Sequence, residues 1–189
     1  MQENLENLRD ELLALLRDRS YERRKVVLAS GRESDFYVDG KQTSLHPRGA
    51  YLLGRLLLEK MALFGRVDAV GGPTLGADPL ATSVALVSSL EGRPMPAFIV
   101  RKEPKGHGTR RWIEGKKNLP EGALVVVVED VVTTGGSGLS AVEKIEEEGY
   151  RVVGLLAVVD REEGAREAIT GKGYRFESLF TKTEIAKPS

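Results

Sequence analysis

Two adjacent carboxylates and a glycine-rich turn make residues 125–137 the most informative segment of the chain. Four valines precede Glu129 and Asp130, and hydroxyl and glycine residues follow at 133–137. Glycines let backbone N–H groups close around a phosphate, and a helix that starts there adds partial positive charge. Carboxylates accept hydrogen bonds and suit sugar hydroxyls, directly or through a divalent cation. The segment predicts a phosphosugar site; the alternative is a structural strand–turn–helix with an acidic surface.

A second cluster with chemical potential is the basic stretch 101–117. It holds seven Lys or Arg against two Glu, and Gly106 and Gly108 flank His107. A mobile basic loop of this kind can close over a polyanion such as diphosphate. The alternatives are a solvated loop or a nucleic-acid patch. The second of these is disfavoured because Trp112 is the only aromatic residue in the stretch and the whole chain is neutral.

The elements that must position these residues follow from hydrophobic periodicity. Leucines at three- and four-residue steps predict an amphipathic helix over 3–18. Residues 25–40 are typical of short extended strands joined by turns. Pro47 fits the first turn of a second helix, which Gly65 ends.

Continuous apolar runs then alternate with helical segments, which predicts a doubly wound, mostly parallel α/β sheet flanked by helices. The strands are expected at 67–72, 96–100, 124–128 and 151–159, the helices at 76–90 and 138–148, and an edge strand at 174–180. Ligands of such sheets bind at the carboxyl ends of the strands, where the carboxylates and the turn lie. No repeat or linker divides the chain, so residues 1–189 are expected to form a single domain.

Composition excludes several classes of protein. The 189 residues carry 28 basic and 28 acidic side chains and no cysteine. Disulfide scaffolds, zinc–thiolate sites and cysteine nucleophiles are therefore excluded, and broad nucleic-acid binding is disfavoured. No apolar run reaches the ~18 to 20 residues of a membrane helix, and the N-terminal residues are charged, unlike a signal peptide. We expect a cytoplasmic protein with no membrane or nucleic-acid partner.

Three segments carry a resemblance to a known family. Residues 125–137 resemble the 5-phosphoribosyl 1-diphosphate (PRPP) binding motif of type I phosphoribosyltransferases. Residues 101–108 are similar to the catalytic loop of the orotate phosphoribosyltransferases, and 30–41 to their N-terminal segment, which contacts orotate. The resemblance implies the type I fold, in which residues 1–45 and the C-terminal segment form a small hood over the active site.

The implied activity is transfer of the 5-phosphoribosyl group from PRPP to orotate, giving orotidine 5′-monophosphate and diphosphate in pyrimidine synthesis. The rivals are a purine phosphoribosyltransferase and a PRPP-sensing nucleic-acid-binding regulator on the same fold. Magnesium is the implied cofactor, bound through PRPP with no direct protein ligand assigned. A homodimer is also implied, in which the loop 101–111 is shared between subunits.

The resemblance also implies residue roles. The expected PRPP contacts are Arg101, Lys102, Lys105, His107, Glu129, Asp130, Val131, Val132, Thr133, Thr134, Gly135, Gly136 and Ser137. Among these, the two acids would hold the ribose hydroxyls, 134–137 the 5-phosphate, and the cations the diphosphate. Lys105, His107 and Asp130 are the expected catalytic residues, with Lys105 the first choice as proton donor to the leaving group. The expected orotate contacts are Phe36, Tyr37, Thr133 and Arg161.

Arg161 has an alternative reading as a surface ion pair with Glu162 or Glu163. Two departures from the family pattern each remove a cation expected to face PRPP. Ala29 stands where a lysine often precedes the S-G-R turn, and Thr74-Leu75-Gly76 where a Tyr-Lys pair is common. The backbone N–H groups of Thr74, Leu75 and Gly76, Lys41, or a lysine of another subunit could replace these cations.

Overall fold

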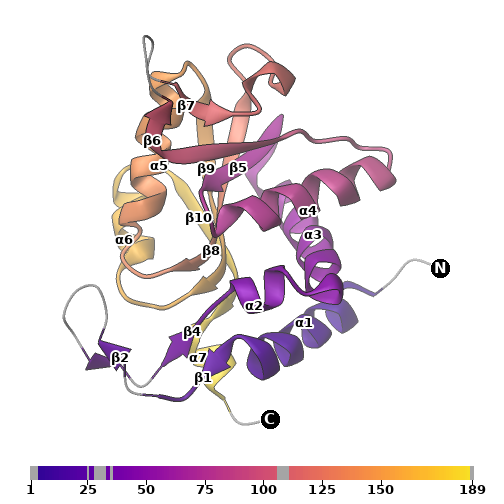
Figure 1. The fold of residues 1–189 in the computed structure, drawn as a ribbon, viewed down its shortest axis with the longest axis vertical. Coiled ribbons are helices and arrows are strands. Elements are labelled where there is room, and N and C mark those ends of the chain that lie inside the picture. The colour runs from indigo at the N-terminus through magenta and orange to yellow at the C-terminus, as the bar shows by residue number, and fades with distance from the viewer. Residues whose placement is uncertain (1–3, 25, 28–32, 35, 106–110, 188–189) are drawn as a thin grey trace.

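A six-stranded sheet forms the centre of the molecule in the computed structural model, which describes residues 4–24, 26–27, 33–34, 36–105 and 111–187 (Figure 1). The strands lie in the order β10-β9-β8-β5-β6-β7, and every neighbouring pair is parallel except the antiparallel pair β6–β7. Their bounds are β5 Ala69–Pro73, β6 Ala97–Lys105, β7 Arg111–Glu114, β8 Leu124–Val132, β9 Arg151–Asp160 and β10 Arg175–Thr181. The predicted mostly parallel sheet is confirmed, including the edge position of β10.

Helices cover both faces of this sheet, which explains why its strands are continuously apolar. Val126 and Val128 pack into one core with α3 (Pro47–Met61) and α4 (Ala77–Leu90). Val125 and Val127 pack into the opposite core with α5 (Gly136–Glu147) and α6 (Ala165–Gly171). Alternate residues of a strand point to opposite faces, so a doubly covered strand must be apolar at every position.

The N-terminal helix α1 (Leu5–Arg19) agrees with the helix predicted over 3–18. It begins at Asn4, whose side chain accepts a hydrogen bond from the Glu6 N–H, and it buries a leucine stripe. The following segment contains the antiparallel pairs β1 (Tyr21–Glu22) with β4 (Tyr37–Val38) and β2 (Val26–Val27) with β3 (Glu33–Ser34), then α2 (Lys41–Ser44). The short strands predicted over 25–40 are therefore confirmed where the structure describes them.

Pro47 occupies the first turn of α3, as the sequence predicts, and His46 caps the start of this helix. A 3-10 turn, η1 (Ala62–Phe64), extends the helix to Gly65, whose φ of 79° ends it. A second 3-10 turn, η2 (Lys116–Asn118), links β7 to β8. No helix in the described part of the chain is long and apolar enough to cross a membrane.

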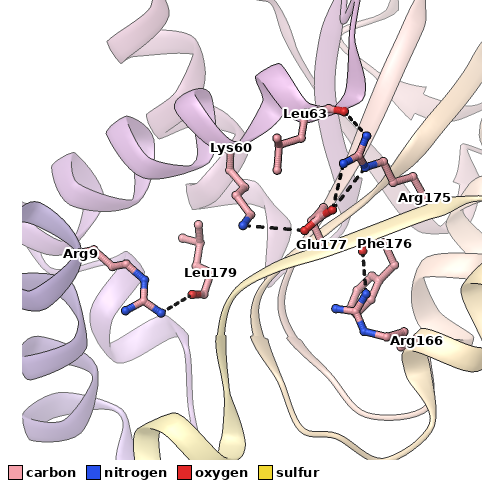
Figure 2. A network of polar contacts seen from close by, with 8 residues as sticks. All are labelled: Arg9, Lys60, Leu63, Arg166, Arg175, Phe176, Glu177 and Leu179. Atoms are coloured by element: carbon pink, nitrogen blue, oxygen red, sulfur yellow. Dashed lines mark hydrogen bonds and ion pairs between the residues drawn. The ribbon is translucent and has the colours of Figure 1, made fainter. Parts of the chain in front are cut away.

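The C-terminal segment returns to α1. Arg17 donates hydrogen bonds to the carbonyls of Glu184 and Ile185 in α7 (Lys182–Ala186). Side chains from α1 and α6 also secure the edge strand β10, since Arg9 donates to the Leu179 carbonyl and Arg166 to the Phe176 carbonyl (Figure 2). Donors placed along an exposed edge discourage pairing with another chain. In Figure 1, α1, α2, β1, β4 and α7 gather at one end of the molecule.

Two expectations are wrong in detail. Residues 101–105 and 111–114 form strands rather than a loop, because an antiparallel pair at the edge of a sheet is held by backbone hydrogen bonds and needs no apolar pattern. The loop residues 106–110 lie outside the described residues. Strand β8 also continues to Val132, so Glu129 and Asp130 lie within the strand rather than beyond its end.

Candidate active site

The two adjacent carboxylates of β8 point to opposite faces of the sheet. Glu129 is buried on the α5 face, where a Cβ added to Gly138 would lie 2.4 Å from its Oε1. Asp130 faces the other side, and a Cβ added to Gly76 would lie 2.4 Å from its Oδ1. The period of two along a strand separates neighbours in this way. Adjacency in the sequence therefore does not make these acids a side-by-side pair.

Burial controls the protonation of Glu129. It raises the pKa of this carboxyl to about 7, a hydrogen bond from Ser137 acts in the lowering direction, and the charge of Asp130 raises it further. The Gly138 N–H at the start of α5 also lowers the value. An acid with this pKa is partly protonated at neutral pH, so it can donate as well as accept a hydrogen bond.

Asp130 occupies a narrow slot between two chain turns. A Cβ at Gly40, just before α2, would lie 2.8 Å from the Asp130 Cβ, and Gly76 closes the other side at the start of α4. Lys41 Nζ lies 3.8 Å from Asp130 Oδ2 and 2.7 Å from Asp39 Oδ1. Burial raises the pKa of Asp130, while the charge of Lys41 lowers it. A larger side chain at either glycine would displace the Asp130 carboxylate. Lys41 and Gly76, which the sequence suggested as PRPP contacts, both lie beside this carboxylate.

The turn that follows β8, residues 133–137, is named here the phosphate cup. Gly135 adopts φ 81° and caps α5, which begins at Gly136. This left-handed conformation favours glycine, and a Cβ there would also meet Ile169 at 3.1 Å. Thr134, Gly136 and Ser137 are exposed, so the hydroxyls and backbone at the start of a 12-residue helix are accessible to a phosphate.

Two of the expected orotate contacts, Phe36 and Arg161, come together next to the cup. The Arg161 N–H donates to the Val132 carbonyl at 2.9 Å, which places this arginine beside Thr133. Its Nη2 donates to the Phe36 carbonyl at 3.3 Å, and its guanidinium carbon lies 5.6 Å from the Phe36 ring centroid. Arg161 also pairs with Glu163 at 3.0 Å. The ion pair weighed from the sequence exists, but it is buried rather than on the surface.

Tyr37 lies on the other side of its short strand from Phe36. Its ring packs under the guanidinium of Arg24, with 4.0 Å between the guanidinium carbon and the ring centroid. Phe36 is buried and packs against Tyr21, with 5.0 Å between ring centroids. Phe36 therefore contacts Arg161 directly, and Tyr37 does not share that contact.

The basic strand segments 101–105 of β6 and 111–114 of β7 are named here the basic arm. Arg101 Nη1 lies 2.8 Å from Glu114 Oε1, which ties the two segments together. A cavity of about 190 Å³ joins the arm to the cup, lined by Pro73, Thr74, Val100, Arg101, Lys102, Ser137, Ser140, Ala141 and Lys144. A second, of about 570 Å³, is lined by Thr74, Leu75, Asp78, Ile99, Arg101, Lys102, Glu103 and Glu114. The cup, the arm and the turn at 74–76 thus share cavities.

The side chains of two predicted catalytic residues lie outside the described part of the structure. His107 lies outside the described residues, and only the backbone of Lys105, the last residue of β6, is described. In the described ranges, no group of three or more His, Cys, Asp or Glu is arranged to hold a metal ion.

Sequence reasoning missed two residues at the site, Asp39 and Lys144. Asp39 organises the start of α2, accepting hydrogen bonds from the Lys41 N–H and the Gln42 side chain at 3.2 Å each. The sequence pattern that could have identified Asp39 is an Asp-Gly pair after a short strand, which is typical of a turn. Lys144 lines the cavity between cup and arm. The sequence pattern that could have identified Lys144 is its spacing of seven residues from Ser137, which puts both residues on one face of the helix.

A comparison with known protein families identifies the class of protein to which the chain belongs. Residues 42–172 match the family model of the phosphoribosyl transferase domain. This range contains the sheet from β5 to β9, the phosphate cup and the basic arm. The fold and the site are therefore those of a phosphoribosyltransferase.

Relatives and solved structures narrow the class. The orotate phosphoribosyltransferase of Sorangium cellulosum is 51% identical over 177 residues, covering 94% of this chain and 92% of the relative. That of a Nostoc species is 49% identical over 182 residues, covering 96% and 87%. The crystal structure of the Mycobacterium tuberculosis orotate phosphoribosyltransferase with Fe(III) dicitrate superposes with a TM-score of 0.83 at 44% identity, covering 95% and 99%. The chain belongs to the orotate phosphoribosyltransferase family.

Proposed function

We propose that this site transfers the 5-phosphoribosyl group from PRPP to orotate, as a cytoplasmic, magnesium-dependent homodimer. The products are orotidine 5′-monophosphate and diphosphate, and the reaction belongs to pyrimidine nucleotide synthesis. The observation that carries the proposal is the convergence of the phosphate cup, Asp130 and Arg161 at the carboxyl ends of β8 and β9. The names of the family members agree with it, and a structure of the M. tuberculosis enzyme contains PRPP.

PRPP would lie across the carboxyl ends of β8, β5 and β6. The cup would bind the 5-phosphate through backbone N–H groups and the Thr134 and Ser137 hydroxyls, assisted by the helix dipole of α5. Asp130 would accept hydrogen bonds from the ribose hydroxyls, whereas Glu129, buried on the α5 face, is no longer assigned to them. Arg101, Lys102, Lys105 and His107 would contact the diphosphate, with Lys41 as a further cation beside Asp130.

Orotate would bind where Arg161 meets Phe36. A guanidinium matches a carboxylate with two parallel hydrogen bonds, and orotate carries one carboxylate. Thr133, next to the Arg161 backbone, is the second side chain that we assign to the base. The buried Arg161 is held by Phe36 and Glu163, so its orientation is set before the base arrives.

The reaction displaces diphosphate from C1 of PRPP by a ring nitrogen of orotate. Bond breaking leaves positive charge on the ribose and negative charge on the leaving group, so cations at the diphosphate and exclusion of water are the main requirements. Lys105 is the first choice for donating a proton to the leaving group, and His107 the second. No covalent nucleophile is required, in agreement with a chain that has no cysteine.

Magnesium would enter the site bound to PRPP, beside the carboxylate of Asp130. The hard carboxylate oxygen of Asp130 beside the expected ribose position suits a site that receives this ion with its substrate. When bound, the ion would neutralise charge on the diphosphate. The residues of this chain would then position the sugar and exclude water.

The homodimer has support on the surface of α4. Leu86 and Leu90, one turn apart on this helix, are 62% and 77% exposed, and Leu75 just before it is 66% exposed. Exposed leucines grouped in this way are typical of an interface. The helix itself packs against β6, the strand that carries the arm, consistent with an arm shared between subunits.

The decisive experiment follows orotate absorbance after addition of PRPP. We expect the absorbance to fall only when PRPP and Mg²⁺ are both present, and chelation of the ion to stop the reaction. Adenine and guanine serve as the comparison acceptors. Rapid turnover of a purine without orotate turnover would assign the chain to the purine enzymes, and salt-dependent nucleic-acid binding without diphosphate release would favour the regulator.

A further inference from the structure

Lys144 on α5 contacts both strands of the basic arm. Its Nζ lies 3.2 Å from the Arg101 carbonyl oxygen and 3.4 Å from that of Lys102, both in β6. The same Nζ lies 4.4 Å from the ring centroid of Trp112 in β7. One ammonium therefore joins the helix to two antiparallel strands by two carbonyl contacts and a cation–π contact.

The contact falls where the ladder between β6 and β7 is irregular. The paired residues are Val100 with Ile113 and then Lys105 with Arg111, and the register shifts between these two pairs. Extra residues in one strand disrupt the regular backbone pairing and leave polar groups that need other partners. Lys144 supplies a donor to two successive carbonyls of this irregular segment.

The C-terminal end of α5 holds β7 by separate contacts. Glu148 Oε1 accepts from the Trp112 N–H at 2.7 Å, and Glu147 Oε2 accepts from the Trp112 Nε1–H at 3.1 Å. Lys116 Nζ lies 2.7 Å from Glu148 Oε2. These contacts secure β7, whereas the polar contacts of Lys144 reach the neighbouring strand β6.

The same helix begins at the phosphate cup. Ser137 and Lys144 are seven residues apart, about two helical turns, and line one cavity together with Arg101 and Lys102. A rigid helix of this length sets the distance between the cup and the segment of the arm that Lys144 holds.

We propose that Lys144 is a positioning residue for the arm: its ammonium holds the irregular segment of β6 so that Arg101 and Lys102 face the cavity that starts at the phosphate cup. This inference rests on the proposed function, because it assigns both cations to the diphosphate of PRPP. The proposed orotate contacts Phe36 and Arg161 do not line this cavity. Loss of Lys144 should therefore weaken PRPP use and leave orotate binding unchanged.

Kinetics of three variants test the inference. Lys144→Met keeps an unbranched apolar stem over Trp112 but removes the charge, and Lys144→Arg restores a cation that can donate to both carbonyls. We expect Lys144→Met to raise the KM for PRPP about tenfold, equivalent to one charge-assisted hydrogen bond, with the KM for orotate within about twofold. Lys144→Arg should recover most of the loss. The matched control is Lys172→Met, an exposed lysine at the end of α6.

A substrate-free measurement separates this inference from the proposed function. Amide hydrogen exchange over 97–105 should be faster in Lys144→Met than in the wild type or in Lys172→Met. Acrylamide quenching of Trp112, the single tryptophan of the chain, should increase in the same variant. If wild-type protein fails to consume orotate with PRPP, the proposed function is rejected and these two readouts alone decide the role of Lys144.

Two outcomes would overturn the inference. One is a Lys144→Met protein with wild-type KM for PRPP and unchanged exchange and quenching. The other is an equal rise in KM for both substrates that Lys144→Arg does not reverse, since that pattern indicates a general structural defect.

Discussion

The phosphate cup and the basic arm are both proposed to bind phosphate groups, but they are held in place by different forces. The cup follows β8, which has β9 and β5 on either side, and Val125 to Val128 beneath it are all fully buried. The arm lies at the antiparallel edge, and contacts from α5 side chains fix it. The difference teaches that the core positions the groups proposed to bind the 5-phosphate, whereas side-chain contacts position the cations proposed to bind the diphosphate.

Stability should differ between the two regions for the same reason. Segments with many buried apolar contacts open only with the whole domain, while edge segments held by polar side chains open locally at lower cost. Substrate release requires such local opening in many enzymes. Variants in the arm should therefore change kinetics, and variants under the cup should change folding.

The largest effect is expected from Lys105→Ala at the end of the arm. Removing one cation that stabilises developing charge costs roughly 10²- to 10³-fold in turnover. Calorimetry should show unchanged orotate binding, because the proposed orotate contacts Phe36, Thr133 and Arg161 lie before β4, after β8 and after β9 rather than on the arm. Lys117→Ala, an exposed lysine beyond the arm, is the control. Wild-type turnover in the Lys105 variant would contradict the proposal that cations of the arm are needed for the reaction.

A core deletion under the cup should act on folding instead. Leu155 in β9 is buried and would lie 2.6 Å from a Cβ at Gly138 in α5. Leu155→Ala should lower the free energy of unfolding by about 2–5 kcal/mol, measured by urea denaturation. Leu5→Ala, at a 37% exposed position in α1, should lose less than about 0.5 kcal/mol. Equal losses in the two variants would contradict the assignment of stability to the sheet core.

The buried acid beside the cup should make stability depend on pH. The pKa of Glu129 is raised from 4.5 to about 7 in the folded protein, so the folded state binds more protons than the unfolded state between these values. The stabilisation is therefore complete below about pH 4.5 and is lost as pH rises through about 7, a change of about 3 kcal/mol.

Glu129→Gln tests this dependence. Relative to the variant, the wild-type free energy of unfolding should decline by about 3 kcal/mol between pH 4.5 and 8, measured without substrate. Asp39→Asn, an acid with a lowered pKa near the surface of the site, is the control and should not reproduce the change. Parallel profiles for wild type and Glu129→Gln would show that Glu129 is ionised in the folded state.

The smallest effect is expected from Glu148→Gln, which weakens the hold of α5 on β7. Glu148 accepts from the Trp112 N–H and pairs with Lys116, and its own side chain is only 8% exposed. We expect a loss of about 1–2 kcal/mol in unfolding free energy and a rise of a few fold in the KM for PRPP. A loss of unfolding free energy as large as that of Leu155→Ala would mean that the arm contributes to stability as much as the hydrophobic core of the sheet does.

The amino-acid sequence by itself determined the class of fold, the order of its main elements and the position of the glycine-rich turn that forms the cup. Valine runs alternating with helical segments require a doubly covered sheet, and the turn from Gly135 into α5 needs a left-handed residue that glycine supplies. These features depend on local pattern and burial, which a sequence records directly.

Only the tertiary structure decided which side chains meet. Glu129 and Asp130 separate because β8 continues past them, and Gly40 and Gly76, 36 positions apart in the numbering, form the two walls of the Asp130 slot. The strand character of the arm and its contacts with Lys144 depend on a backbone register and on a helix that begins more than twenty residues after the arm ends. Such contacts arise from packing between distant segments, and local residue patterns carry no record of them.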